Sequence, residues 1–444
     1  MKRIFYLSAL CSLLLSGACS DENEVRHGML ENPYTTLSAE AKGYPACIAV
    51  SYRIAADAVS AGYLYGVCWN TEGNPTIQDN CHYGPQKPAN GEPMTQYLPN
   101  THFEYGKTYH FRTFVVADSQ VWYSEDTAAA LDGESLAPIA LEWTKQNFAG
   151  LPEGIEVYKT TSDLNGRKFQ AWYAIADCSG DGIELRVQNP RRSSGVTVDG
   201  QFTDDCYVLV NGGYFNFSDR SKPDGIEVID GTSYGEMYNP RGSWTAGDEE
   251  YDRYYSATRG VFGVDAAGKP SVYWAGSINN RITYYPQPLP SVRGEAQYGA
   301  LSSILPTAPA QWTPRYAVSA GPVIMRNGEC LIDGTMTEKN QPMTDYEIWT
   351  DGLASASYLA DQTIVGCTAD GKVVLFICDG RVQGLSLGAS HREASAILKS
   401  LGVVDALKLD GGGSTAMVVC GQHVNYHADE NRPVGSTLGF FRKQ

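Results

Sequence analysis

The chain has 444 residues, a formal net charge of −16 at pH 7, and a composition that is 43% hydrophobic and 19% charged. This balance is typical of a globular protein and excludes a disordered chain, and the length suffices for two or three domains. A chain this acidic is a poor general binder of nucleic acid, so no nucleic-acid partner is expected. Any bound phosphate would need local arginines and backbone amides.

The first segment, MKRIFYLSALCSLLLSGACS, is typical of an export signal. Lys2 and Arg3 precede an apolar run that is too short to span a membrane, and small residues follow. LSGAC resembles a bacterial lipobox, which implies that residues 1–18 are removed and that Cys19 is lipidated. The acidic SDENE resembles the surface-export signal of Bacteroidetes lipoproteins. We therefore expect an outer-membrane or surface lipoprotein with a tether over residues 19–33; a signal peptide without lipid is the alternative.

Residues 34–131 contain a series of short strand signals. CIAVSYRIA, GYLYGVCWN, KTYHFRTFVVA and VWYSE are rich in β-branched and aromatic residues, and Gly, Pro and Asn clusters separate them. These runs resemble the fibronectin type III-like modules of Bacteroidetes surface proteins. The resemblance implies an immunoglobulin-like or fibronectin III-like β-sandwich that serves in spacing or docking. LDGESLAPIA reads as the linker that follows it.

Residues 140–444 form a second unit in which strand-like runs dominate. One helix stands out in SHREASAILKSLG, whose small and apolar residues fall on one face. Ser390 and Glu393 have the spacing of a capping box, and Gly402 suits the end of the helix. The capping box accounts for Glu393 without a catalytic role, and His391 is expected to be exposed on the first turn.

Nine cysteines follow Cys19, and no two of them form a CxxC pair. An exported protein can form disulfides, but an odd number leaves at least one thiol unpaired within the chain. No acidic cluster has the spacing of a calcium loop, and no zinc motif is present. Neither a metal nor another cofactor is predicted.

The stretch LKLDGGGSTAMVV, residues 407–419, places three consecutive glycines after an aspartate at the end of an apolar run. Glycine costs conformational entropy and packs no side chain, so three together suggest a close approach to the backbone. No lysine follows them, as a Walker loop requires, and TAMVVCGQHVNY reads as strand, turn and strand rather than a dinucleotide-binding helix. Two readings remain: a loop whose N–H groups converge on an anion or oxygen-rich ligand, or simply a tight turn or bulge.

Two more glycine-containing loops directly follow apolar strands. They are ICDGRVQGLSL, with Asp379 and Arg381, and VNGGYFN at residues 210–216. An isolated Asp-Gly is usually only a turn. Three such loops in one domain, however, predict a shared rim where strands end, and binding sites are commonly built in such places.

Six motifs in order resemble the phosphodiester glycosidase family over roughly residues 200–440: VNGGYFN, AVSAGPVIMRNGE, TIVGCTADGKVVLFICDGR, GLSL, ALKLDGGGSTAMVV and RPVGSTLGFF. Each is weak alone, whereas the ordered set is specific. The resemblance implies a mixed α/β (α+β) domain that hydrolyses sugar-1-phosphodiesters, such as GlcNAc-1-phosphodiesters, to free sugar and a phosphomonoester. The substrate-binding residues that it implies are Asn211, Gly212, Gly213, Tyr214, Phe215, Arg381, Gly411, Gly412, Gly413, Ser414, Thr415 and Arg432.

Breaking a sugar–O–P linkage requires groups that hold a singly charged phosphodiester. An arginine fork matches two phosphate oxygens, and convergent glycine amides stabilise charge without lysine. We assign Arg381 and Arg432 to phosphate contact, with Gly412, Gly413 and Ser414 as backbone and hydroxyl donors. A surface ion pair is the alternative role for Arg432.

A carboxylate is needed to activate water or to stabilise an oxocarbenium-like centre, and many glycosidases use two. A phosphate leaving group is weakly basic, so an acid is not essential. Asp410 is the first catalytic candidate and Asp379 the second; both could instead cap loop amides at strand ends. Tyr214 and Phe215 could stack on a pyranose, and Asn211 could bind a hydroxyl or acetamido group. An aromatic core and an Asx turn are the alternatives for these three.

One position departs from the family pattern. Family members commonly read RTAIG where this chain reads QTIVG, with Gln362 in place of the arginine. If that arginine helps to hold phosphate, this protein has lost a phosphate ligand, or Arg259 or Arg381 substitutes for it; the departure bears on the identity of the substrate more than on the reaction class. This departure favours a second hypothesis, a non-catalytic glycan-binding surface lipoprotein. A third is a metal-dependent phosphodiesterase. The sequence specifies neither the sugar, nor the alcohol half, nor whether C1–O or O–P is cleaved.

Overall fold

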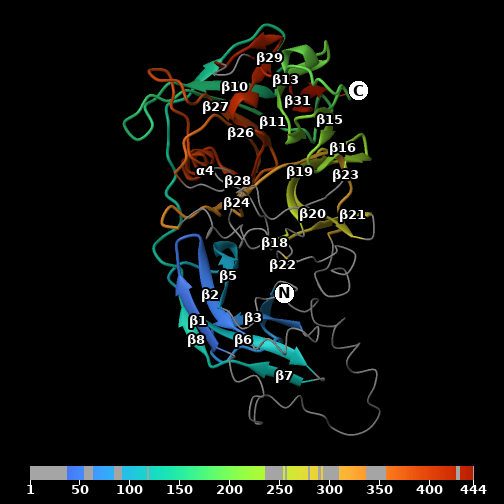
Figure 1. Ribbon diagram of the computed structural model, residues 1–444. Helices are drawn as coiled ribbons and strands as arrows, with labels where there is room; N and C mark the ends of the chain where they lie inside the picture. The colour runs from blue at the N-terminus through green and yellow to red at the C-terminus, as the bar shows by residue number, and fades with distance from the viewer. Residues whose placement is uncertain are drawn as a thin grey trace.

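The computed structural model describes residues 38–54, 64–84, 93–117, 120–235, 254–255, 258–278, 281–288, 292–293, 310–336, 357–426 and 431–443. The expected signal segment 1–18, Cys19 and the tether 19–33 lie outside these ranges. Figure 1 shows two bodies, with the N-terminal strands in blue and cyan below and the later strands in green to red above. Within the described ranges, no helix is both long enough and apolar enough to cross a membrane.

The N-terminal body consists of two antiparallel sheets that share one hydrophobic core. Alternate side chains of both sheets point inward, among them Val50, Tyr52, Val67 and Phe111. This arrangement agrees with the sandwich predicted from the strand signals, while likeness to a fibronectin III module stays a prediction. One sheet has the order β1 (Ser38–Gly43), β2 (Cys47–Arg53), β5 (Met94–Pro99); the other has the order β4 (Asn80–Tyr83), β3 (Leu64–Asn70), β6 (Tyr109–Ala117), β7 (Gln120–Tyr123), with β8 (Thr127–Ala129) also paired to β6, and η1 spans Asn100–His102.

The C-terminal body is built from three larger sheets, and every strand pair in them is antiparallel. The eight-stranded sheet has the order β25 (Glu329–Cys330), β24 (Val323–Arg326), β28 (Val403–Lys408), β26 (Gln362–Thr368), β27 (Val373–Cys378), β11 (Ala171–Ala176), β10 (Ile155–Thr160), β9 (Thr144–Gln146). The five-stranded sheet has the order β12 (Ile183–Gln188), β31 (Thr437–Arg442), β13 (Cys206–Asn211), β29 (Met417–Val419), β30 (Gln422–His423).

The third sheet has six strands, and two short ribbons complete the body. The six-stranded order is β17 (Thr232–Gly235), β16 (Ile226–Ile229), β23 (Pro314–Ser319), β19 (Arg259–Asp265), β20 (Pro270–Ile278), β21 (Arg281–Tyr285). The ribbons are β14 (Phe215–Asn216) with β15 (Asp219–Pro223) and β18 (Tyr254–Tyr255) with β22 (Val292–Arg293); η2 spans Asp199–Gln201 and η6 spans Gly412–Ser414.

One large core joins the three sheets of the C-terminal body. It includes Ile364 of the eight-stranded sheet, Leu185 of the five-stranded sheet and Phe262 of the six-stranded sheet, all fully buried. All six residues of β27 are buried, which explains why that strand reads as an unbroken apolar run instead of an alternating one. The sheets therefore form a rigid frame around the loops that follow β13, β27 and β28.

Helix α4 (His391–Ser400) is the one α-helix among the described residues. The predicted capping box is confirmed, because the Ser390 side chain accepts from the Glu393 N–H while the Glu393 side chain accepts from the Ser390 N–H. Gly402 (φ +80°) follows the helix, as predicted. The prediction that His391 is exposed is wrong: its ring is buried where α4 packs on β24 and β28. The described part of the domain is mainly β-sheet with this one α-helix, so the structure gives only weak support to the expected mixed α/β class.

None of the nine cysteines after Cys19 forms a disulfide in the structure. Cys68 and Cys81 stand opposite each other in the register of β3 and β4, but they are not bonded. The fold described here therefore rests on burial and hydrogen bonding without a disulfide.

Candidate functional site

The three glycine-containing loops meet at one edge of the C-terminal body. β27 and β28 both pair antiparallel with β26, so they run parallel to each other and end at the same edge. Asp361, just before β26, lies between these two ends. β13 of the five-stranded sheet ends beside them, because Asn211 Nδ2 donates to the backbone oxygen of Asp410 (2.7 Å). The predicted rim is thus confirmed.

Side chains approach the triple-glycine loop closely on both sides. Gly412 has φ +59°, a left-handed conformation that favours glycine, and a Cβ there would lie 3.6 Å from Arg381 Nη2. A Cβ on Gly411 would lie 2.9 Å from the Asp361 carbonyl oxygen and 3.3 Å from Lys408 Nζ. The glycines therefore allow a guanidinium and an ammonium group to reach the backbone.

The amides of this loop are used mainly within the protein. The N–H of Gly411 donates to Asp410 Oδ1 (2.9 Å), that of Gly412 to the Asp361 carbonyl (3.1 Å), and that of Ser414 to the Gly411 carbonyl (3.2 Å). The Gly412 and Ser414 amides are thus engaged within the protein, while the predicted donor roles of the Gly413 amide and the Ser414 hydroxyl stay predictions. The cations beside the loop are further groups that can hold a phosphate.

Asp410 is half-buried at the start of the loop, and its backbone is fixed on both sides. Its N–H donates to the Gly212 carbonyl (3.2 Å), and its carbonyl accepts from Asn211. Burial raises the pKa of its carboxyl group, and the nearby charge of Lys408 opposes that rise. A carboxylate with a raised pKa can accept a proton during a reaction.

Lys408 is buried next to Asp410, and sequence reasoning missed it. Its Nζ donates to Tyr214 Oη (3.1 Å) and to the Leu409 carbonyl (2.7 Å). Burial lowers its pKa to about 8, and the neighbouring Asp410 opposes the shift. The signal in the sequence was a charged residue inside an otherwise apolar strand, two positions before the aspartate. Side chains two apart on a strand share a face, so this spacing brings the two charges together.

Tyr214 belongs to the site, whereas its neighbours in the NGGYF motif are structural. Its hydroxyl donates to the Gly321 carbonyl (2.8 Å) and accepts from Lys408. Phe215 packs in a small core with residues of β13 and β29. A Cβ on Gly212 would lie 2.4 Å from Ser436 Oγ, and one on Gly213 would lie 2.3 Å from the Ser319 carbonyl oxygen. These two glycines allow close packing of neighbouring loops.

Asn211 is fully buried, and its amide is engaged within the protein. Besides the bond to Asp410, its Oδ1 accepts from Thr363 Oγ1 (2.7 Å) and from the Ala416 N–H (3.2 Å). Thr363 Oγ1 also lies 3.3 Å from Thr415 Oγ1. Asn211 and Thr415 therefore position the loop instead of facing a ligand, which differs from the predicted contact with a sugar.

Arg381 reaches the triple-glycine loop from the loop after β27. Its Nε donates to Asp361 Oδ2 (2.6 Å), and Asp361 Oδ1 accepts from the Gly380 N–H (3.1 Å). Asp361 is 3% exposed, while Arg381 is about one-third exposed, so the guanidinium combines a buried anchor with an accessible edge. Burial raises the pKa of Asp361, and the Arg381 charge opposes that rise.

Asp379, the second catalytic candidate, is fully buried and faces the protein interior. Its carboxylate accepts from Gln170 Nε2 (2.5 Å) and from the Tyr426 N–H (3.0 Å). Burial raises its pKa, and these donors oppose the shift. Asp379 therefore matches the alternative role, a carboxylate that caps groups at a strand end.

Gln362, at the departure from the family pattern, lies 2% exposed on the α4 side of the site. Its Nε2 donates to the Ala389 carbonyl (2.9 Å), and its Oε1 has no hydrogen-bond partner within the described part of the chain. Both ring nitrogens of His391 also have no hydrogen-bond partner within the described part of the chain. Burial lowers the pKa of His391 to about 3, and the charge of Lys408 contributes to this shift. Of the two possible substitutes for the lost arginine, Arg259 interacts with Asp224 (3.4 Å), so Arg381 is the one that lies against the loop.

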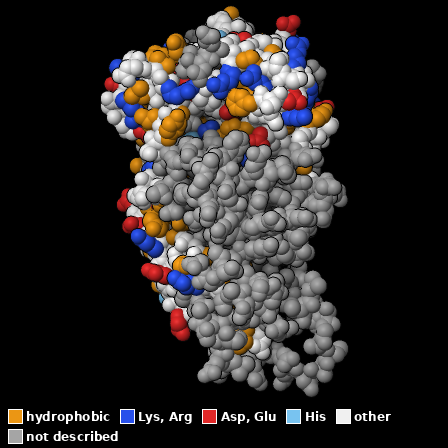
Figure 2. Space-filling model, in the orientation of Figure 1, with side chains coloured by type: hydrophobic (Ala, Val, Ile, Leu, Met, Phe, Trp, Pro, Cys, Tyr) orange, Lys and Arg blue, Asp and Glu red, His pale blue; other side chains and the backbone are white. Residues whose placement is uncertain are grey.

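Arg432 borders the site from the segment before β31. Its positive charge opposes the rise in the pKa of Asp410, and its Cζ lies 6.0 Å from the ring centroid of Phe217. On the face shown in Figure 2, Lys and Arg side chains gather among hydrophobic ones on the upper part of the C-terminal body. The acidic chain thus carries a locally basic region.

Over the residues that the structure covers, no group of three His, Cys, Asp or Glu side chains could hold a metal ion.

Comparisons with known proteins give the same family as the motifs. The sequence profile of the phosphodiester glycosidase family matches residues 204–441, and no curated protein matches the chain. One similar structure is the zebrafish N-acetylglucosamine-1-phosphodiester alpha-N-acetylglucosaminidase catalytic domain auto-inhibited by its pro-peptide, with 19% identity, 68% of this chain and 88% of that chain covered, and a TM-score of 0.41.

Two further similar structures come from bacteria. A hypothetical protein from Synechocystis has 15% identity, covers 91% of this chain and 99% of its own, and has a TM-score of 0.40. A putative exported protein from Burkholderia pseudomallei is 16% identical; the match covers 95% of this chain and 100% of that protein's chain, with a TM-score of 0.40. Because the family profile spans more than half of the 444 residues, this chain belongs to the phosphodiester glycosidase family.

Proposed function

We propose that the C-terminal domain hydrolyses sugar-1-phosphodiesters of the GlcNAc-1-phosphodiester kind, releasing free sugar and leaving a phosphomonoester. The observation that carries the proposal is that Lys408 and Asp410 lie beside the triple-glycine loop, close enough for each charge to affect the pKa of the other, with Arg381 against the same loop. Together these groups supply one carboxylate and two cations around one loop. Membership of the phosphodiester glycosidase family supports the reaction class.

The cations have the task of holding the phosphodiester. Arg381 is fixed through Nε by Asp361, and its accessible edge places a positive charge beside the loop, where it can contact phosphate oxygens. Lys408 supplies a second positive charge, and Tyr214 orients the ammonium group by accepting one of its protons in a hydrogen bond. In a partly buried site, these charges stabilise the negative charge that develops on the leaving oxygen more strongly than water does.

Asp410 has the task of activating water. In the proposed step, the water oxygen bonds to C1 of the sugar while the C1–O bond breaks and its electron pair stays on the phosphate oxygen. The water proton passes to Asp410 and is later lost to solvent. The leaving phosphate needs no proton at this stage because it is weakly basic, so one carboxylate suffices, and the loss of Asp379 as a second candidate does not weaken the mechanism.

The direct test is sugar release from a GlcNAc-1-phosphodiester by purified residues 20–444, with Asp410→Asn alongside. We expect turnover by the parent protein and its loss in the variant, with an unchanged circular dichroism spectrum. Isotopically labelled water then separates the two bonds: label in the sugar indicates C1–O cleavage, and label in the phosphate indicates O–P cleavage and would overturn the attack on C1.

Gln362 favours the second hypothesis, a glycan-binding surface protein without catalysis, because it replaces a family arginine. Saturable sugar binding near the triple-glycine loop, without turnover of the diester, would support that hypothesis. Turnover that is lost with EDTA and restored by a divalent cation would instead favour a metal-dependent phosphodiesterase.

A further inference from the structure

A solvent-exposed aromatic ring stands at the border of the proposed site. Phe217 lies at the turn of the β14–β15 ribbon and is 69% exposed, the highest value among the large hydrophobic side chains that the structure describes. Single exposed hydrophobic residues are common on protein surfaces. The surroundings of this ring, however, distinguish it from an incidental one.

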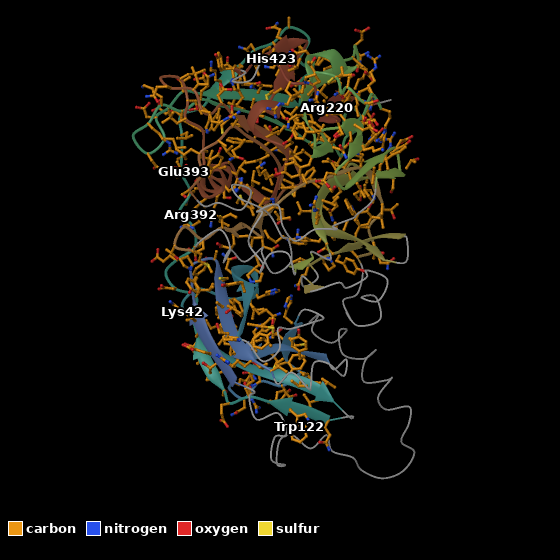
Figure 3. All side chains as sticks on the ribbon, viewed as in Figure 1. Lys42, Trp122, Arg220, Arg392, Glu393 and His423 are labelled. Carbon is orange, nitrogen blue, oxygen red and sulfur yellow. The ribbon has the colours of Figure 1, made fainter. Side chains whose placement is uncertain are left out.

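Two arginines and a second aromatic ring lie beside Phe217. The Cζ of Arg220 lies 5.9 Å from its ring centroid, and that of Arg432 lies 6.0 Å away. Arg220 Nη1 is anchored on the Ser194 carbonyl (3.0 Å), and the buried ring of Phe215 lies 5.2 Å from Phe217 between centroids. Figure 3 shows Arg220 among the strands around β13 and β15, well apart from Glu393 on α4. The ring therefore lies against Phe215 and is bordered by positive charge.

Backbone contacts connect this ribbon to the catalytic loop. The Asp224 N–H donates to the Tyr214 carbonyl (2.8 Å) at the base of the ribbon, and the Tyr214 hydroxyl contacts Lys408. The segment that carries Arg432 continues to Ser436, whose carbonyl accepts from the Gly212 N–H (2.9 Å). Because the Gly212 carbonyl in turn accepts from the N–H of Asp410, backbone hydrogen bonds join the segment that carries Arg432 to the proposed catalytic loop.

We propose that Phe217, with Arg220 and Arg432, forms an outer subsite that binds the alcohol half of the phosphodiester through the flat face of a ring. This inference rests on the proposed function. If C1 of the sugar lies at Asp410 and the phosphate lies among the cations, the alcohol half extends outward past Arg432. An acyl chain would need an apolar groove, whereas a single exposed ring between polar groups suits a ring-shaped partner that stacks on one face.

The test compares two diesters that share the same sugar-1-phosphate. One carries a methyl group as its alcohol half, and the other carries a hexose joined through its 6-hydroxyl. Losing the apolar contact between the ring and the sugar face predicts about a tenfold rise in KM for the hexose diester in Phe217→Ala, with little change for the methyl diester. Phe217→Trp should preserve the preference, because it keeps a flat face.

A matched control is Tyr234→Ala. Tyr234 is also exposed and also lies under an arginine, Arg191, whose Cζ is 4.1 Å from its ring centroid, but it belongs to β17. This variant should treat both diesters as the parent protein does. Equal effects of Phe217→Ala on the two diesters, or no effect on either, would overturn the subsite.

Binding separates this inference from the proposed reaction. Calorimetric titration of both diesters into Asp410→Asn, with and without Phe217→Ala, measures the subsite even if no turnover occurs. A tighter Kd for the hexose diester that disappears with the ring would support the subsite while the absence of turnover counts against the reaction. Equal Kd values for the two diesters would overturn the subsite, whatever the turnover.

Discussion

Two aspartates of the C-terminal domain occupy matching positions and have different surroundings. Asp379 and Asp410 each follow an apolar strand and precede a glycine, and their strands flank β26 at the same edge. Asp379 is fully buried, and amide groups satisfy its carboxylate. Asp410 is half-buried next to a cation. The residue two positions earlier makes the difference: it is Ile377 on one strand and Lys408 on the other. In this chain, the aspartate that we propose as catalytic is thus the one that has a charged residue on the same face of its strand.

Replacing each aspartate by asparagine is the strongest test of the difference between Asp379 and Asp410. Asp410→Asn should lower kcat/KM by about 10³-fold, because the amide cannot accept a proton. Its fold should be retained, since a neutral group costs less to bury than a carboxylate. Asp379→Asn should keep most activity at low temperature but lose about 1–3 kcal/mol of stability, because an amide cannot accept from every donor around this carboxylate.

Sugar release at 15–20 °C below the unfolding midpoint, together with urea unfolding, measures both effects. If Asp379→Asn instead abolished turnover with an unchanged unfolding midpoint, Asp379 would regain its place as a second catalytic carboxylate, and the contrast between the two loops would fail.

Lys408→Met probes the cation that sets the two loops apart. Activity should fall by about 10²-fold, because a charge that stabilises the transition state is removed. Stability should rise, since lowering the pKa of Lys408 from 10.5 to about 8 means that burying its charged form costs roughly 3 kcal/mol at neutral pH. Such a trade between stability and activity is common at functional sites. Lys372→Met, at an exposed lysine in the turn between β26 and β27, is the control and should change neither quantity.

The pH dependence follows from the same shift. Lys408 is cationic below about pH 8 and loses its charge above it, so turnover should decline as the pH rises through that value. The unfolded chain binds the proton up to a higher pH than the folded chain does, so the stabilising effect of deprotonation grows above about pH 8. Activity and stability should therefore move in opposite directions between pH 8 and 10. A turnover profile that stays flat across this range would exclude a charged Lys408 from the reaction.

The sequence predicted the edge on which the site lies better than it predicted the roles at that edge. Apolar runs ending in Asp-Gly or Asn-Gly-Gly identified three strand ends, and strand pairing brings them together. The roles of Asn211 and Asp379 depend on their partners Thr363 and Gln170, which are distant in sequence. The burial of His391 arises in the same way, from packing of α4 on a sheet. Periodicity within one segment contains no information on these contacts.

The smallest expected effect is a change in KM that distinguishes Gly412, which lies at the proposed site, from Gly371, which only allows a turn of the backbone. Gly412 (φ +59°) and Gly371 (φ +88°) both adopt left-handed conformations, so alanine at either should cost about 1 kcal/mol of stability. A Cβ at Gly371 meets nothing within 4 Å, whereas one at Gly412 faces Arg381 Nη2 at 3.6 Å, an ordinary contact distance. Gly412→Ala should therefore also raise KM several-fold, because the methyl group enters the space where the guanidinium would meet a phosphate. Parallel urea unfolding and sugar-release assays measure both effects. Equal KM values in the two variants would mean that the triple glycine is only a turn.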